Sequence, residues 1–226
     1  MPEPTESRAQ ALRPEAIAGA FRLTDLAWTG DGQALIWCEG RSGRTTLVSW
    51  SRQGRFRRDL VREPDVQARV GYGGGEFAVG GSRIYYVSGR RLYSIGLEPG
   101  EPTLVTEADC NLCSPTVSPD GRWILLIGGD DTRDRVLIAA ANGGSPVELF
   151  GESDFAMQPC WHPGGQRVGW ISWDHPFMPW QRTRLIVADL DFGESLPRLS
   201  TRHVVESASG RPCAWFHPSF SLDGSR

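Results

Sequence analysis

Residues 113–127, CSPTVSPDGRWILLI, decide the fold. A short β-prone stretch, 113–117, leads into the turn Asp120-Gly121, and the apolar run 123–127 follows. Asp-Gly suits a two-residue hairpin, because that turn needs positive φ at its centre. The apolar run predicts a strand that is buried on both faces. Further strands are predicted at 135–140 and 147–150, so this segment forms a unit of four antiparallel strands.

The same pattern recurs along the chain. Its turn glycines, Gly32, Gly81, Gly121, Gly165 and Gly224, are separated by 49, 40, 44 and 59 residues. Periods of this size, with four strands in each, are typical of β-propeller blades. We therefore predict an all-β fold. A lead-in segment, 1–22, contains a helix-like stretch at 14–21. The propeller follows at 23–226, with blades at about 23–62, 66–107, 113–150 and 154–202 and the start of a fifth at 203–226.

The C-terminal residues begin another unit. Residues 214–221 are predicted as its inner strand, and Asp223-Gly224 as the following turn. Because an unpaired strand exposes backbone donors and acceptors, we expect these four and a quarter blades to be part of a larger ring. The alternative is a four-bladed propeller whose tail closes the first blade.

Composition excludes several classes of function. The formal net charge of -3 argues against a nucleic-acid partner, which requires a basic surface. No stretch approaches the ~20 apolar residues needed to cross a membrane, and the N-terminus has no apolar signal segment. The five cysteines are odd in number and scattered. We therefore expect a cytoplasmic protein with reduced thiols and no membrane partner.

Two segments resemble a known family. Residues 173–180 read Trp-Asp-His-Pro-Phe-Met-Pro-Trp, and residues 69–77 read Arg-Val-Gly-Tyr-Gly-Gly-Gly-Glu-Phe. They are similar to the propeller of acylaminoacyl-peptidase-like and dipeptidyl-peptidase-like members of the prolyl oligopeptidase family. There the first loop commonly reads Trp-Asp-His-Pro-Asn-Met-Pro-Trp-Asp-Gly-Thr. Here Phe177 replaces its Asn, and Gln181 and Arg182 replace its Asp-Gly. If that carboxylate orders the loop or binds a partner, this chain does so differently or not at all.

The resemblance implies a seven-bladed propeller followed by an α/β-hydrolase domain with a Ser, Asp, His triad. The propeller would cap the active site and restrict access to peptides, without a cofactor. The sequence contains no Gly-x-Ser-x-Gly, the strained turn that carries the nucleophile. We therefore expect a non-catalytic chain whose partners are its own hydrolase domain and peptide substrates. The rival interpretation is a free-standing TolB-like or WD-type scaffold that binds proteins.

The best candidate for a functional site is the loop 174–182, rich in Pro, Trp and Met. We expect His175, Met178 and Trp180 to face the hydrolase domain or the substrate cavity. The alternative is that Met178 and Trp180 pack between neighbouring blades.

The second motif segment adds Tyr72, Gly73 and Gly74. Its glycines would let another backbone come close, since they have no side chain in the way. The alternative is a flexible start to the blade.

Cysteines Cys110 and Cys113 form a lone C-x2-C pair. Cys160 and His162 could be imagined as two further zinc ligands, but nothing in the spacing fixes their approach. We predict no metal ligand and no catalytic residue in this chain.

Overall fold

The computed structural model describes residues 22–41, 43–72, 74–193, 196–205 and 211–226. Over these residues the chain forms four sheets, each of four antiparallel strands in sequence order. The predicted all-β propeller fold is therefore confirmed. The described residues form no helix, and so no helix able to span a membrane. The helix-like stretch predicted at 14–21 lies outside them.

The strands follow the predicted blades closely. Blades 1 and 2 consist of β1 (Arg22–Trp28), β2 (Ala34–Arg41), β3 (Arg44–Ser51), β4 (Arg57–Asp59), β5 (Phe77–Gly80), β6 (Arg83–Ser88), β7 (Arg91–Gly96) and β8 (Thr103–Glu107). Blades 3 and 4 consist of β9 (Asn111–Val117), β10 (Trp123–Gly129), β11 (Asp134–Ala140), β12 (Val147–Phe150), β13 (Phe155–Trp161), β14 (Arg167–Trp173), β15 (Arg184–Asp191) and β16 (Arg198–Val205).

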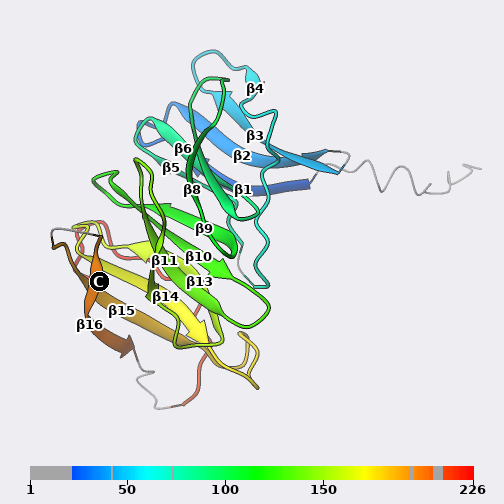
Figure 1. The fold of residues 1–226 in the computed structure, drawn as a ribbon. Coiled ribbons are helices and arrows are strands. Elements are labelled where there is room, and N and C mark those ends of the chain that lie inside the picture. The colour runs from blue at the N-terminus through cyan, green and yellow to red at the C-terminus, as the bar shows by residue number, and fades with distance from the viewer. Residues whose placement is uncertain (1–21, 42, 73, 194–195, 206–210) are drawn as a thin grey trace, which may run out of the picture.

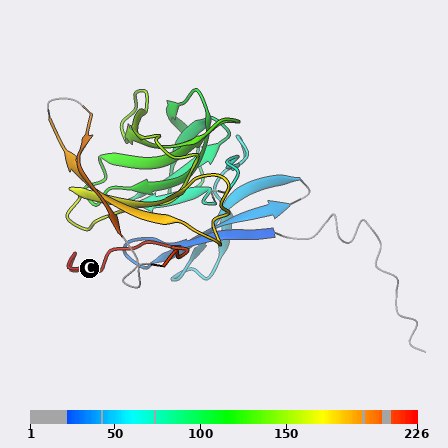
Figure 2. The same ribbon diagram turned by 90° about the horizontal axis from the view of Figure 1, so that it is seen from below.

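The four sheets pack side by side, with one hydrophobic layer between each sheet and the next (Figures 1 and 2). Strand β10 shows how the layers form. Its residues Ile124 and Leu126 pack in the layer between blades 2 and 3, while Leu125 and Ile127 pack in the layer between blades 3 and 4. Successive side chains of a strand point to opposite faces, so an uninterrupted apolar run fits a sheet that is covered on both sides. The predicted burial of this strand is confirmed.

Of two turns predicted as two-residue hairpins, one has that width and the other, at Asp120-Gly121, is wider. The two-residue hairpin prediction holds at Gly81-Ser82, where β5 and β6 pair up to the turn. At Asp120-Gly121 it is wrong, because the Ser118 N–H donates to the Trp123 carbonyl at 2.8 Å and leaves four residues in the loop. The Ser118 hydroxyl donates to Asp120 at 2.6 Å and accepts the Trp123 N–H at 2.9 Å. These side-chain acceptors satisfy the backbone of the wider loop.

Four of the five units have a non-glycine residue with positive φ in the same place; blade 2 does not. Three of them sit at bulges in β1, β9 and β13, where the register with the second strand shifts. Each lies seven residues before the turn glycine of its own unit: Asp25 before Gly32, Ser114 before Gly121, Gln158 before Gly165 and His217 before Gly224. Bulges re-aim side chains and backbone groups, and here they turn groups of one blade toward the next.

The fifth unit differs from the prediction. Residues 214–221 do not form a strand, because the second strand that would pair with them is not among the described residues. The segment runs along blade 4 instead. The Thr183 N–H donates to the Cys213 carbonyl at 3.0 Å, and the His217 N–H donates to the Gln158 side chain at 2.6 Å. The following turn is formed, since the Ser221 N–H donates to the Arg226 carbonyl at 2.7 Å.

Blade 1 is not closed by this tail. Its sheet contains β1 to β4 alone within the described part of the chain, so the four-bladed alternative is not supported. The apolar side chains Leu23, Leu26 and Trp28 of β1 are exposed. The predicted boundary at residue 203 falls inside β16, which continues to Val205.

Candidate functional site

The structure brings together the two segments that carry the family motifs. The Tyr72 hydroxyl donates a hydrogen bond to the Met178 sulfur at 3.4 Å. These residues are 106 positions apart in sequence. Tyr72 lies in the connection between blades 1 and 2, and Met178 in the loop between β14 and β15. The predicted site residues Tyr72 and Met178 therefore share one surface.

Aromatic rings hold this surface in place. Tyr72 meets Phe155 and Trp173 edge-on, with ring centroids 5.4 Å away in each case. Phe155 stacks on Trp173 at 5.0 Å, and His175 packs edge-on against Phe155 at 4.9 Å. Edge-to-face and offset stacked pairs are the favourable arrangements of aromatic rings. Thus His175 joins the cluster that seats the loop on blade 4.

The loop presents apolar side chains to solvent. Trp180 is 66% exposed, Met178 39% and Tyr72 40%, whereas Pro179 between the first two is buried. Trp180 therefore does not pack between the four blades that the structure describes. Large apolar side chains gathered on a folded surface mark a contact site for a protein or ligand.

Gln181 orders this loop in place of the carboxylate typical of the family. Its side-chain oxygen accepts the Met178 N–H at 2.9 Å, and the Gln181 N–H donates back to the Met178 carbonyl at 2.9 Å. Arg182 lies over the Phe177 ring, with its guanidinium carbon 5.3 Å from the centroid. The two positions where this chain departs most from the family motif thus support the loop by a neutral amide and a cation–π contact.

The close backbone approach predicted for the glycine segment occurs at Gly75. Its φ is +97°, and a Cβ built there would lie 3.0 Å from the Ser114 Cα. Its carbonyl accepts the Ser114 N–H at 2.8 Å, which joins blades 2 and 3. At Gly74 a Cβ would meet nothing within 4 Å. The Gly74 carbonyl accepts a hydrogen bond from the Ser114 hydroxyl. The predicted Gly73 lies outside the described residues.

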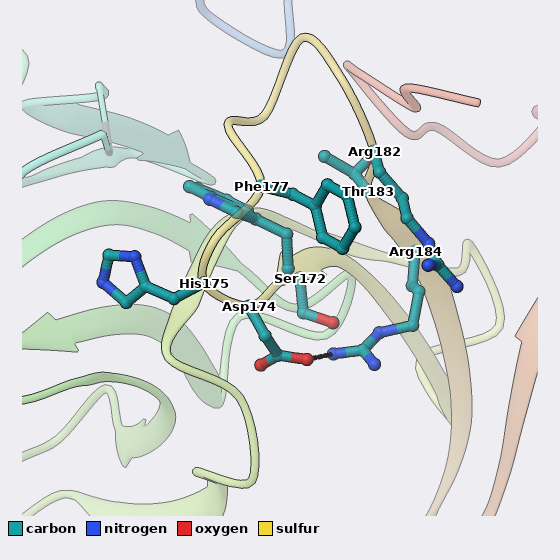
Figure 3. Close-up of a pocket in the computed structure, with 8 residues that line it drawn as sticks. Ser172, Asp174, His175, Phe177, Arg182, Thr183 and Arg184 are labelled. Carbon is teal, nitrogen blue, oxygen red and sulfur yellow. Dashed lines mark hydrogen bonds and ion pairs between the residues drawn. The ribbon is translucent and has the colours of Figure 1, made fainter. Parts of the chain in front are cut away.

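A pocket of about 180 Å³ opens beside this loop (Figure 3). It is lined by Ser172, Trp173, Asp174, His175, Phe177, Arg182, Thr183 and Arg184. Figure 3 shows the imidazole of His175 pointing away from Arg182 and Arg184. None of the pocket's charged groups was singled out for binding by sequence reasoning. An available signal was the acidic residue at the end of one apolar strand and the two arginines at the start of the next.

An ion pair forms the floor of the pocket. Arg184 donates to Asp174 at 2.5 Å and to the Ser153 hydroxyl at 3.1 Å. The other oxygen of Asp174 accepts the Asp154 N–H at 3.0 Å, and Asp154 in turn accepts the His175 N–H at 2.8 Å. The two aspartates therefore tie the loop to the start of blade 4.

A half-buried pair of carboxyl groups, Asp25 and Glu76, lies between blades 1 and 2. The Asp25 carboxylate accepts the Glu76 N–H at 2.5 Å, and burial together with Asp25 raises the pKa of Glu76 to about 7. Two carboxyl groups this close cannot both ionise easily, so a proton is retained near neutral pH.

The cysteines do not gather. Burial raises the pKa of Cys113 to about 12 and that of Cys160 to about 11, which keeps both thiols protonated at neutral pH. In the part of the chain that the structure describes, no three His, Cys, Asp or Glu side chains are placed to hold a metal ion.

No family model and no curated protein matches the sequence. Solved structures do match. A puromycin-hydrolyzing peptidase from Mycobacterium tuberculosis is 25% identical with a TM-score of 0.69, and the match covers 84% of this chain and 32% of that one. The chain is similar to the propeller of a prolyl oligopeptidase family peptidase.

Two further structures support the same fold. A puromycin hydrolase is 21% identical, with a TM-score of 0.68 and coverage of 84% of this chain and 33% of its own. A putative TolB from Agrobacterium tumefaciens is 18% identical, with a TM-score of 0.61 and coverage of 80% and 66%. The chain thus spans about a third of the length of the peptidases that it matches. The sequence of this chain contains no Gly-x-Ser-x-Gly.

Proposed function

We propose that this chain is the non-catalytic propeller portion of a serine peptidase of the prolyl oligopeptidase type. One observation carries the proposal: the likeness to the puromycin-hydrolyzing peptidase extends over 84% of this chain but only 32% of the peptidase. The absence of a nucleophile turn from the sequence agrees with it. The triad would then belong to an α/β-hydrolase domain outside these 226 residues, and no cofactor is needed.

The exposed loop residues are the proposed contact with that domain. Trp180 and Met178 present apolar surface next to Tyr72, on a loop fixed by buried Pro179 and by Gln181. A rigid apolar surface suits the wall of a cavity that admits peptides and turns away folded proteins. In this proposal the surface narrows access to the active site, and the peptide substrate passes beside it.

The test compares loop variants of the complete peptidase. Trp180→Ala widens the passage, so hydrolysis of a ~20-residue peptide relative to a dipeptide substrate rises several-fold. Leu104→Ala is the matched control, since Leu104 is also an exposed apolar residue but lies on β8. If the Trp180 and Leu104 variants gave the same ratio as the unmodified enzyme, the gating proposal would be wrong.

A free-standing scaffold is the competing outcome. The chain covers 66% of the TolB structure, twice its share of the peptidases. At 18% identity that likeness shows the fold alone. A protein that hydrolyses no peptide in its complete form, yet retains a partner protein through the exposed loop, would favour the scaffold.

A further inference from the structure

The pocket beside the loop contains a buried hydroxyl group without a partner. Ser172 is completely buried, and its Oγ makes no hydrogen bond with any described residue. In Figure 3 this hydroxyl points into the space between Asp174, Arg184 and Phe177. A buried polar group that loses its water and gains no partner costs free energy. A ligand that forms a hydrogen bond with this hydroxyl would recover that cost.

The charged groups on the pocket wall that still have free hydrogen-bonding capacity are donors. Thr183 is already engaged, since its hydroxyl donates to the Trp215 carbonyl at 3.0 Å. Both oxygens of Asp174 are occupied by Arg184 and the Asp154 backbone. Arg184 uses one guanidinium nitrogen for its contacts, and Arg182 has no acidic partner among the described residues. The free hydrogen-bonding capacity of the pocket therefore calls for an acceptor.

The net charge of the pocket lining and its aromatic side chains limit the kind of ligand that can bind. Asp174, Arg182 and Arg184 leave a net charge of +1 in the lining, which matches a single negative charge. The guanidinium fork favours a planar carboxylate, which it can hold with two parallel hydrogen bonds. The rings of Trp173 and Phe177 line the same space and offer contact to an apolar group next to that carboxylate.

We propose that this pocket binds the carboxylate of a small apolar or aromatic amino-acid residue, as found at the C-terminus of a peptide. Arg182 and the Ser172 hydroxyl hold the carboxylate, Arg184 adds a second charge from the floor, and the aromatic wall contacts the side chain. Asp174 positions Arg184. The site belongs to this chain alone, so its occupancy does not depend on peptidase activity.

The test is an NMR titration of the 226-residue chain with N-acetyl-phenylalanine, followed at the indole N–H signal of Trp173. The signal is assigned by its loss in Trp173→Phe. N-acetyl-phenylalaninamide lacks the charge, and inorganic phosphate lacks the apolar group. We expect saturable binding of the acid, with the amide and phosphate at least about tenfold weaker, the effect of losing one charge-assisted hydrogen bond or the apolar contact.

Two variants and a control locate the site. Arg182→Gln and Ser172→Ala each weaken binding by at least about tenfold. The second removes only a hydroxyl that has no partner, so the fold is retained. Arg52→Gln, on the exposed β3–β4 turn, leaves the affinity unchanged. Equal binding of acid and amide, tighter binding of phosphate, no saturable binding, or unchanged affinity in both pocket variants would each overturn the proposal.

Discussion

Replacing Gly75 by alanine tests how the glycine segment joins blades 2 and 3. Its φ of +97° places it where side chains are disfavoured, which costs roughly 1–2 kcal/mol for an L-residue. The added Cβ would lie 3.0 Å from the Ser114 Cα, and overpacking of this kind costs about 1–3 kcal/mol. We therefore expect Gly75→Ala to lower the free energy of unfolding by about 2–5 kcal/mol.

The assay is urea unfolding followed by tryptophan fluorescence. With an m-value of about 2–3 kcal/mol/M, the midpoint falls by roughly 1–2 M in Gly75→Ala. Gly74→Ala is the matched control, because a Cβ there meets nothing within 4 Å. Its midpoint changes by no more than about 0.2 M, since exposed substitutions alter stability by about 0.5 kcal/mol or less. Equal midpoints for the two variants would refute the close approach of Gly75 to Ser114.

Three further predictions concern pH, the core and the turns. Because the pKa of Glu76 is raised from 4.5 to about 7, the folded chain holds this proton more tightly; the free energy of unfolding falls by roughly 1–3 kcal/mol between pH 4.5 and 7, and Glu76→Gln flattens this fall in urea titrations at several pH values. Trp170→Ala, in the layer between blades 3 and 4, lowers the free energy of unfolding by about 3–5 kcal/mol in the same assay; a loss below 1 kcal/mol would contradict its burial. Ser118→Ala removes the hydroxyl that bonds Asp120 and the Trp123 N–H and lowers the thermal midpoint, corresponding to about 1 kcal/mol; an unchanged midpoint would count against it.

The blades could be predicted from the sequence because their signals are local. The strand at 147–150 agrees with β12 at both ends, since a turn precedes it and the start of the next blade follows it. The turn at Asp120-Gly121 was predicted too narrow, because its width depends on the side-chain hydrogen bonds of Ser118. The strand predicted at 214–221 required a pairing partner that local pattern cannot supply.

The site was predictable only in part. The family motifs pointed to Tyr72, Met178 and Trp180, and the structure brings the first two into contact across 106 positions. No local pattern reveals that contact, which depends on how the four blades stack. The pairing of Asp174 with Arg184 depends on the register of β14 and β15, in which Ser172 lies opposite Arg184. The glycine that makes the close backbone approach is Gly75. The sequence did not single it out, because neither its φ nor the position of Ser114 can be inferred from glycine content.

The most direct test of the account is a peptidase assay on two proteins. One is the 226-residue chain, and the other is the complete product of the coding sequence in which the chain lies. Both are given chromogenic aminoacyl and acyl-aminoacyl substrates under the same conditions. The account predicts hydrolysis by the complete product and none by the 226-residue chain. Hydrolysis by the chain alone, or by neither protein, would contradict its assignment as the propeller of a serine peptidase.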